Sequence, residues 1–141
     1  GQQPTLEALQ SQLAGKIVCN VVAPLEFEKG IGAVAINVPG KSAAQEAAAQ
    51  LPESTVVSAF QNMSAEKLMD LPHPVECDVL VCGRDAEAKA TIIGLANQID
   101  GVRGVDAGGL SQSRYVEMLT SLLINLNRKY KTHTSIKIVG L

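Results

Sequence analysis

The stretch "CDVLVCGRDAEAKATIIGLANQIDGVRGVDAGG", residues Cys77–Gly109, contains a strand, a helix and a second strand in succession. The apolar run CDVLVCG predicts a buried strand. Asp85 follows it and is of a residue type that caps helices, and the run VRGVDAGG predicts the second strand. Two strands joined by one helix are typical of a parallel pair. The apolar residues expected on one face of the helix are Ala88, Ile92, Leu95 and Ile99.

Strands and helices also alternate in the first half of the chain. Lys16–Ala23 and Ser54–Phe60 are nearly continuous apolar runs, as in strands that are covered on both faces. One helix is expected from Pro4 onward, before the first of these runs. Another is expected between the two runs, where Ser42 and Gln45 form a capping-box pattern. This alternation predicts an α/β fold with a mainly parallel sheet.

The last 31 residues predict a long helix and a closing strand. The run SIKIVGL, Ser135–Leu141, predicts the strand. We expect residues 76–141 to form a small C-terminal α/β lobe, and residues 1–75 to be the second half of a Rossmann-like domain. The apolar residues at helical spacing in the long helix are Tyr115, Met118, Leu119, Leu122, Leu123 and Leu126.

The segment Glu28–Gly40 carries the glycine spacing of a dinucleotide-binding fingerprint, because Gly30, Gly32 and Ala35 match G-x-G-x-x-G/A. In that motif a strand precedes the glycines and a helix follows them, so that free N–H groups meet the pyrophosphate. Here charged residues precede the glycines, and the residues after them alternate like a strand and run into Pro39. We therefore predict a glycine-containing turn into a short strand, and no phosphate loop.

Composition excludes several function classes. The formal net charge of −2 and the pI near 5.7 argue against a nucleic-acid partner, which needs clustered Lys and Arg. No apolar run has the length of a membrane span, so we expect a soluble, cytoplasmic protein. The three cysteines lie in or beside apolar runs without C-x-x-C spacing, and no His and Cys cluster predicts a metal site.

Polar residues at the ends of the predicted strands are the candidates for ligand contact, because ligands of parallel sheets lie outside the carboxyl ends of the strands. Gln61 and Asn62 offer amide donors and acceptors, and no nucleophile has a partnering base. Asn62 or Ser64 could equally cap a following helix, and an Asx turn could equally explain Asp106. The strand-end segments are Asn20–Pro24, Gln61–Ala65, Gly83–Asp85 and Ala107–Leu110.

Four runs of the chain, in their order and spacing, resemble one family. The runs are KIVCNVVAPLEF, KSAAQEAAAQLPESTVVSAFQNMSAEKL, CDVLVCGRDAEAK, and VDAGGLSQSRYVEMLTSLLINLNRKY followed by IKIVGL. They are similar to the carboxyl-terminal two-thirds of the NADPH-dependent reductases of the deazaflavin coenzyme F-420. The NADP-binding domain of the STEAP metalloreductases shows a similar arrangement. The resemblance covers nearly all of the chain.

The resemblance implies an oxidoreductase that transfers hydride directly between NADP(H) and coenzyme F-420, with the protein positioning both rings and excluding water. By matching position, Ala23 lies near the nicotinamide-side ribose and Gln61 lies near the deazaflavin. Small-molecule cofactors are the partners that it implies. A homodimer is expected on a different ground, because a sheet without its first half would expose a strand edge and apolar faces that tend to pair with another chain. Strand-end position and resemblance together give the candidate cofactor-binding residues: Asn20, Val22, Ala23, Gln61, Asn62, Met63 and Ala65.

The chain also departs from the family pattern. The family's first strand and glycine-rich phosphate loop would precede Gly1, so we expect this chain alone to be inactive. Gln61 stands where the family commonly has His, and Gly109 where it often has Pro. Two alternatives to the reductase therefore stay open. One is a non-catalytic assembly or dimerisation module, and the other is an NADP-linked reductase of a different acceptor, such as ferric ions or a small ketone.

Overall fold

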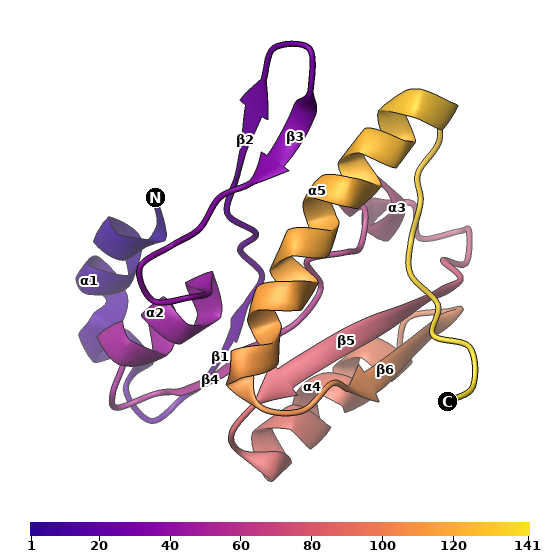
Figure 1. Ribbon diagram of the computed structural model, residues 1–141. Helices are drawn as coiled ribbons and strands as arrows, with labels where there is room; N and C mark the ends of the chain where they lie inside the picture. Colours follow the sequence, from indigo (N-terminus) through magenta and orange to yellow (C-terminus); the bar gives the residue numbers. More distant parts are fainter.

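The computed structural model describes residues 1–141, and its helices and strands alternate along the chain as shown in Figure 1. The elements are α1 (Gln2–Leu13), β1 (Ile17–Asn20), β2 (Leu25–Glu28), β3 (Gly32–Ala35), α2 (Ala43–Gln50), β4 (Thr55–Ser58), α3 (Ala65–Met69), β5 (Cys77–Gly83), α4 (Ala86–Asn97), β6 (Val102–Asp106), the 3₁₀ turn η1 (Leu110–Gln112) and α5 (Ser113–Tyr130).

The main sheet has four strands in the order β1-β4-β5-β6. β1 with β4 and β5 with β6 are parallel, whereas β4 and β5 are antiparallel, so the predicted mainly parallel α/β fold is confirmed. The antiparallel pair divides the strand ends between the two edges of the sheet. The carboxyl ends of β1 and β4 share one edge. Gly83–Asp85 and Ala107–Leu110 lie at the opposite edge, so the four strand-end segments do not share one edge of the sheet.

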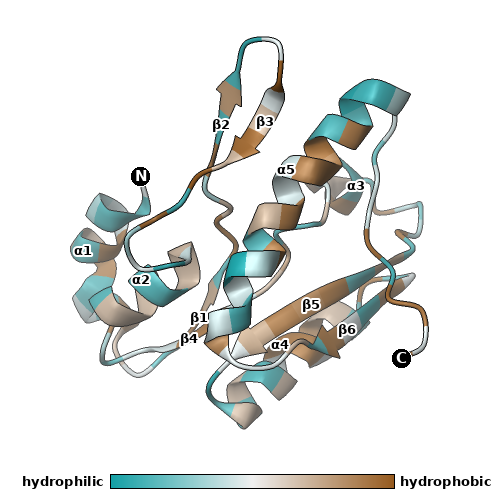
Figure 2. Cartoon of the chain, viewed as in Figure 1, coloured by the Kyte–Doolittle hydropathy of each residue, from teal (hydrophilic) through white to brown (hydrophobic).

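Both faces of the sheet are covered, as the two neighbouring valines of β4 show. Val57 is fully buried in a cluster with Val79 and Val81 of β5, against α4. Val56 points to the other face, where it packs with Leu6 of α1 and with α2. Figure 2 shows β5 as a long and mostly hydrophobic strand that lies over α4, while α1 and α2 stand beside β1 and β4. The apolar runs of β4 and β5 therefore formed strands buried from both sides, as the sequence predicted. The run Lys16–Ala23 did not: β1 is the edge strand, and its Ile17 is 44% exposed.

The predicted β–α–β unit is confirmed. The carboxylate of Asp85 accepts a hydrogen bond of 2.7 Å from the N–H of Ala88, which caps α4. Ala88 and Ile92 are buried as expected, but Leu95 is 52% exposed. The buried face continues through Ala96 because residues four apart lie on one line of the helix, and Leu95 is turned away from it.

The fingerprint glycines lie in a β-hairpin. Gly30 and Gly32 have φ of 83° and 109° at the turn that joins β2 to β3, and the two strands pair with each other in a separate antiparallel sheet. The turn into a short strand is confirmed, and no helix begins at these glycines. The sequence did not predict β2, because the charged strand LEFE is exposed along most of its length and carries no buried pattern.

The buried face of the long helix α5 does not coincide with its predicted apolar face, because Leu119, Leu123 and Leu126 are half-buried and the other three predicted residues are exposed. Its buried residues include Ser113, Glu117 and Ser121, together with Val116. The apolar residues on its exposed face are Tyr115 (58% exposed), Met118 (40%) and Leu122 (53%). Helical spacing therefore identified residues that share a face, but not the direction in which that face points.

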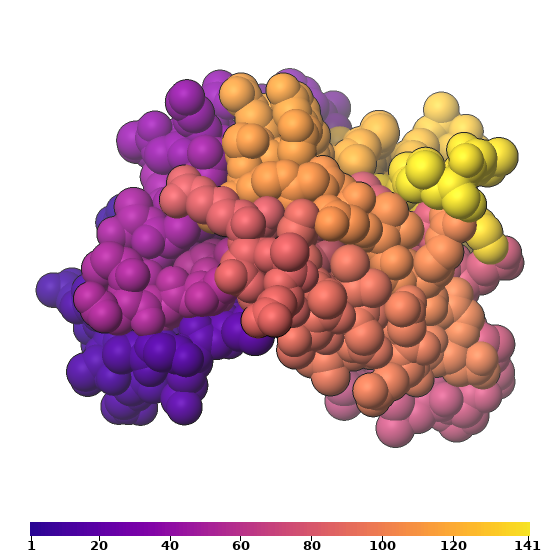
Figure 3. Space-filling view, turned by 90° about the horizontal axis from the view of Figure 1, so that it is seen from below, coloured from indigo at the N-terminus to yellow at the C-terminus, as the bar shows by residue number.

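The C-terminal segment after α5 forms no strand, so the expected strand at Ser135–Leu141 was wrong. The segment runs beside β5, and the N–H of Asp78 donates to the backbone oxygen of Ile136. The N–H of Ile138 donates to the carboxylate of Asp78 and not to a backbone oxygen of β5. In the view from below, the N-terminal helices and the α4–β6 region form two masses that meet in the middle (Figure 3). β4 pairs with β5 although the predicted domain boundary at residue 75 lies between them in the sequence. The division into residues 1–75 and 76–141 stays a prediction.

Candidate functional site

The carboxyl ends of β1 and β4 bring Asn20 and Gln61 together. The backbone oxygen of Asn20 accepts a hydrogen bond from the N–H of Ala59 and a longer one, 3.4 Å, from Nε2 of Gln61. The side-chain oxygen of Asn20 accepts from the N–H of Val22, an Asx-type turn that ends β1 earlier than the predicted residue 23. These neighbouring strand ends form the edge on which the sequence placed a ligand.

The segment after β4 is held in an unusual conformation. Phe60 has φ of 68°, in the left-handed region that non-glycine residues rarely adopt. The turn places Gln61 below the strand end, where its Nε2 donates to Oγ of Ser58 over 2.7 Å. Gln61 is only 7% exposed, and its Oε1 is a buried oxygen without a hydrogen-bond partner. A buried unpartnered acceptor costs free energy unless a donor reaches it, so this oxygen is an open hydrogen-bond acceptor at the strand end.

Thr120 of α5 fixes the loop that carries Gln61 and Asn62. Its hydroxyl donates to the backbone oxygen of Gln61 over 3.0 Å, and Nδ2 of Asn62 donates to the same hydroxyl and to the backbone oxygen of Val116. Asn62 is therefore bound to α5 and does not cap α3. That cap is Ser64, whose hydroxyl accepts from the N–H of Lys67, so one of the two capping alternatives is confirmed.

A small pocket of about 70 Å³ lies between this loop and α5. Its volume equals the share of about two liquid water molecules, so it accepts the edge of a ring system rather than a whole fused ring. Polar amide and hydroxyl groups alternate in it with apolar side chains, which suits the edge of a heteroaromatic ring. The lining residues are Gln61, Asn62, Met63, Ser64, Thr120, Leu123, Ile124, Asn127 and Thr134.

The predicted site residues do not all meet in this pocket. Val22 and Ala23 line a different, larger cavity of about 530 Å³, with Pro24 and residues of α1 and α2. Asn20 connects the two places, because its Nδ2 donates to Oε1 of Gln2 at the larger cavity while its backbone contacts Gln61. Ala65 begins α3, is exposed and lines neither pocket.

Sequence reasoning missed Glu117, which links α5 to α2. Its two carboxylate oxygens accept hydrogen bonds of 2.9 and 3.1 Å from the N–H groups of Ala43 and Ala44, the first residues of α2. Burial raises the pKa of Glu117, and these two N–H donors oppose that shift. The only signal for it was a charged residue within the apolar part of a predicted helix.

The remaining ionisable groups leave no metal centre. No group of three or more His, Cys, Asp and Glu side chains is arranged to hold a metal ion. The carboxylate of Asp106 accepts a hydrogen bond from the N–H of Gly108, which forms an Asx turn, and pairs with Lys89 at 2.9 Å. These contacts favour the Asx turn as the explanation of Asp106. None of the helices combines the length and apolarity that a bilayer crossing needs.

Comparison with known proteins found relatives that match nearly the whole chain. The chain is 48% identical over 139 residues to an F-420-dependent NADP reductase of Methanocaldococcus jannaschii, and 38% identical over 144 residues to one of Methanothermobacter thermautotrophicus. These matches span 97% and 99% of this chain. The chain is a homologue of the F-420-dependent NADP reductases. It spans 62% of the length of both relatives.

A solved structure and a more distant relative are also similar to this chain. A solved structure described as a candidate F-420-dependent NADP reductase of Arthrobacter sp. FB24 superposes with a TM-score of 0.81 at 29% identity, over 94% of this chain and 61% of that one. The metalloreductase STEAP3 of Rattus norvegicus is 35% identical over 120 residues, which cover 85% of this chain and 23% of that protein. No protein-family model matches the chain.

Proposed function

We propose that the chain is part of an oxidoreductase that transfers hydride between NADP(H) and coenzyme F-420. The observation that carries the proposal is the pocket at Gln61–Ser64, whose buried Oε1 of Gln61 has no partner, in a homologue of F-420-dependent NADP reductases. When bound, the cofactors supply the chemistry: NADPH gives a hydride to the deazaflavin ring, which also takes up a proton. The NADP-linked reduction of another acceptor is the competing activity.

The residues of the pocket would bind and orient one edge of the deazaflavin. Oε1 of Gln61 is the acceptor for a ring N–H, and Asn62 and Thr120 hold the loop in place from α5. Met63, Leu123 and Ile124 supply apolar contact that keeps water from the ring. On the other side of Asn20, Val22 and Ala23 line the larger cavity, which we propose as the nicotinamide side.

Calorimetric titration of this chain with oxidised F-420, and separately with NADP⁺, tests the proposal. We expect F-420 to bind in the micromolar range and NADP⁺ to bind much more weakly, because the fingerprint glycines lie in a hairpin and no helix begins there to hold a phosphate group. We expect Gln61→Leu to weaken F-420 binding by about tenfold, the effect of one lost hydrogen bond to a ligand. Binding of NADP⁺ without any binding of F-420 would favour a reductase of another acceptor.

A second candidate function, an assembly or dimerisation module, is favoured by one observation. Tyr115, Met118 and Leu122 place an exposed apolar face on α5. We propose that this face pairs with a second copy of the chain, which would make the protein a homodimer. Failure of both cofactors to bind a stable dimer would make assembly the better account.

The cytoplasm is the compartment that we propose. All three cysteines are free, and Cys77 and Cys82 are buried in the core, as is typical of proteins from reducing compartments. Fractionation of cells that express the protein tests this, and recovery in the soluble cytoplasmic fraction is expected.

A further inference from the structure

The pocket at Gln61–Ser64 is lined by that loop, by α5 and by the start of the C-terminal segment, which forms a third wall. Thr134 lines the pocket and is bound to Asn127 of α5, whose Oδ1 accepts from the N–H of Thr134 over 2.6 Å and from its hydroxyl over 2.7 Å. Both residues of this link line the pocket. Beyond this link, the hydroxyl of Ser135 donates to the backbone oxygen of Glu76, and Ile136 accepts from the N–H of Asp78. The position of the wall therefore also depends on what holds the residues that follow Thr134.

An ion pair between two strands holds these residues. Arg103 of β6 donates from Nε and Nη2 to the two carboxylate oxygens of Asp78 of β5, over 2.8 and 2.6 Å. The same guanidinium donates to the backbone oxygens of Ile138 and Leu141. Asp78 in turn accepts from the N–H of Ile138 over 2.7 Å. One bidentate pair thus fixes both ends of residues 138–141.

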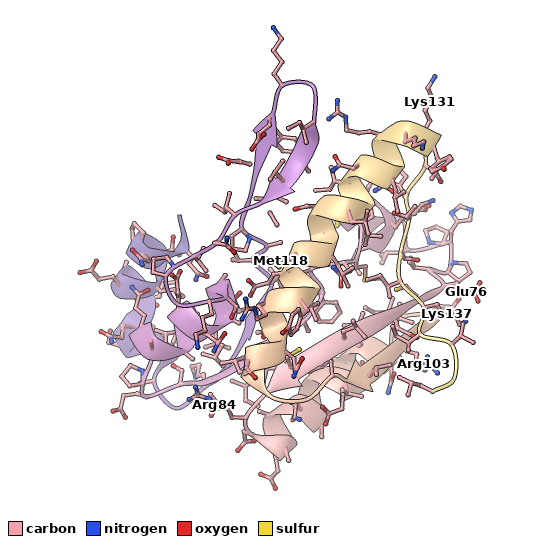
Figure 4. All side chains as sticks on the ribbon, viewed as in Figure 1. Glu76, Arg84, Arg103, Met118, Lys131 and Lys137 are labelled. Carbon is pink, nitrogen blue, oxygen red and sulfur yellow. The ribbon has the colours of Figure 1, made fainter.

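Burial makes this pair different from the other ion pair at the segment. The side chain of Asp78 is 1% exposed, so its charge depends on Arg103 for compensation. Lys137 and Glu76 also pair, at 2.7 Å, but their side chains are 56% and 78% exposed, where such pairs contribute little. Figure 4 shows Arg103, Glu76 and Lys137 gathered beside the C-terminal segment. The exposed pair is therefore a matched control for the buried one.

We propose that Asp78 and Arg103 are positioning residues for the ring pocket: they clamp residues 136–141 against β5 and so set where Thr134 stands. That the ligand of this pocket is the deazaflavin ring of F-420 rests on the proposed function. Neither residue touches the pocket, so the clamp acts through the backbone of the C-terminal segment.

The test compares Arg103→Gln, Arg103→Lys and Lys137→Gln by F-420 affinity and by amide hydrogen exchange of residues 134–140. We expect Arg103→Gln to speed exchange there and to weaken F-420 binding on the order of tenfold, as small displacements of a binding wall do. Arg103→Lys keeps the charge and should restore part of both. Lys137→Gln should leave both within about twofold of the wild type, as exposed pairs contribute little.

Two controls keep the test decisive. Because Arg103→Gln leaves the buried charge of Asp78 alone, the pair Asp78→Asn with Arg103→Gln is measured as well, under conditions where exchange in the β5–α4 core matches the wild type. Faster exchange with unchanged F-420 affinity in both variants would overturn the clamp. If the wild type binds no F-420, the proposed function fails, and unchanged exchange at residues 134–140 would then overturn the clamp independently.

Discussion

At the scale of single residues, the decisive groups are polar side chains buried between elements. Glu117 satisfies two N–H groups at the start of α2 from a different helix. Asp78 does the same for β6 and the C-terminal segment through Arg103. Buried carboxylates of this kind join segments that are far apart in the sequence, and each is costly to leave without its partners.

Replacing Glu117 with Gln should lower the free energy of unfolding by about 1–3 kcal/mol, because an amide offers one acceptor where two N–H groups need one each. Urea denaturation measures the change. Glu87→Gln is the control, since Glu87 is exposed on α4 and its loss should cost less than about 0.5 kcal/mol. Equal effects of the two substitutions would contradict the role given to Glu117.

The Asp78–Arg103 pair should make stability depend on acid pH. The Arg103 guanidinium holds the pKa of Asp78 below its ordinary value of 3.8. A carboxyl group with a lowered folded-state pKa stabilises the fold above its unfolded pKa and loses that contribution as the pH falls through the folded value. We therefore expect the stability difference between the wild type and Asp78→Asn to shrink below about pH 4 in urea titrations at several pH values.

Glu117 should contribute the opposite slope. Its raised folded-state pKa gives stability that is fully present below the unfolded value near 4.5 and is lost as the pH rises through the folded value. The stability difference between the wild type and Glu117→Gln should therefore change as the pH rises above about 4.5, and stay constant in the range where the Asp78 difference shrinks. A difference that is flat from acid to neutral pH would contradict this.

At the scale of elements, close packing of α4 on β6 depends on Gly104. A side-chain carbon at that position would stand 3.0 Å from the backbone of Ile93, which leaves no room without moving the helix. The absence of a side chain on β6 therefore sets the distance between helix and strand.

Gly104→Ala should cost about 1–3 kcal/mol of unfolding free energy by forcing α4 away from the sheet. Gly94→Ala is the matched control in the same unit: Gly94 is exposed in the middle of α4 and has nothing within 4 Å of the added carbon. That control should gain up to about 1 kcal/mol, because alanine favours the helix. Thermal unfolding of both variants would show opposite shifts, and destabilisation by Gly94→Ala would count against the packing argument.

Elements built from local signals could be predicted from the sequence, whereas their orientation could not. The cap at Asp85, the strands at Cys77–Gly83 and Val102–Asp106 and the turn at Gly30 follow from neighbouring residues. The direction of α5 depends on Glu117 meeting α2, a contact across 73 residues of sequence. The ring pocket was half predicted for the same reason: Gln61–Met63 lie at a strand end, but Thr120 and Thr134 come from distant segments.

At the scale of the whole molecule, one antiparallel pair between β4 and β5 separates the two edges of the sheet. The ring pocket lies beyond the carboxyl ends of β1 and β4, and a cavity lined by Arg84, Asp85 and Leu110 lies at the opposite edge. The exposed apolar face of α5 is a third surface, which includes Met118 on the side seen in Figure 4. The proposed cofactor and the proposed second copy thus use different parts of the molecule.

A charge on the exposed face of α5 should separate dimer from monomer. Leu122→Glu places a carboxylate on the face formed by Tyr115, Met118 and Leu122, where burial in an interface would remove the water that hydrates the charge. We expect the wild type to sediment as a dimer and this variant as a monomer of 14.8 kDa with the same helix content. Ala90→Glu, which places the same carboxylate on the exposed side of α4, is the control. A wild-type protein that is already monomeric at high concentration would contradict the dimer.

The most direct test of the central claim is the change in backbone amide chemical shifts when oxidised F-420 is added to the isotopically labelled protein. The account predicts that shifts concentrate at residues 61–64, along Thr120–Asn127 and at Thr134, around the pocket between the loop and α5. Shifts concentrated at Arg84, Asp85 and Leu110, on the opposite edge of the sheet, or no shifts at saturating F-420, would contradict it.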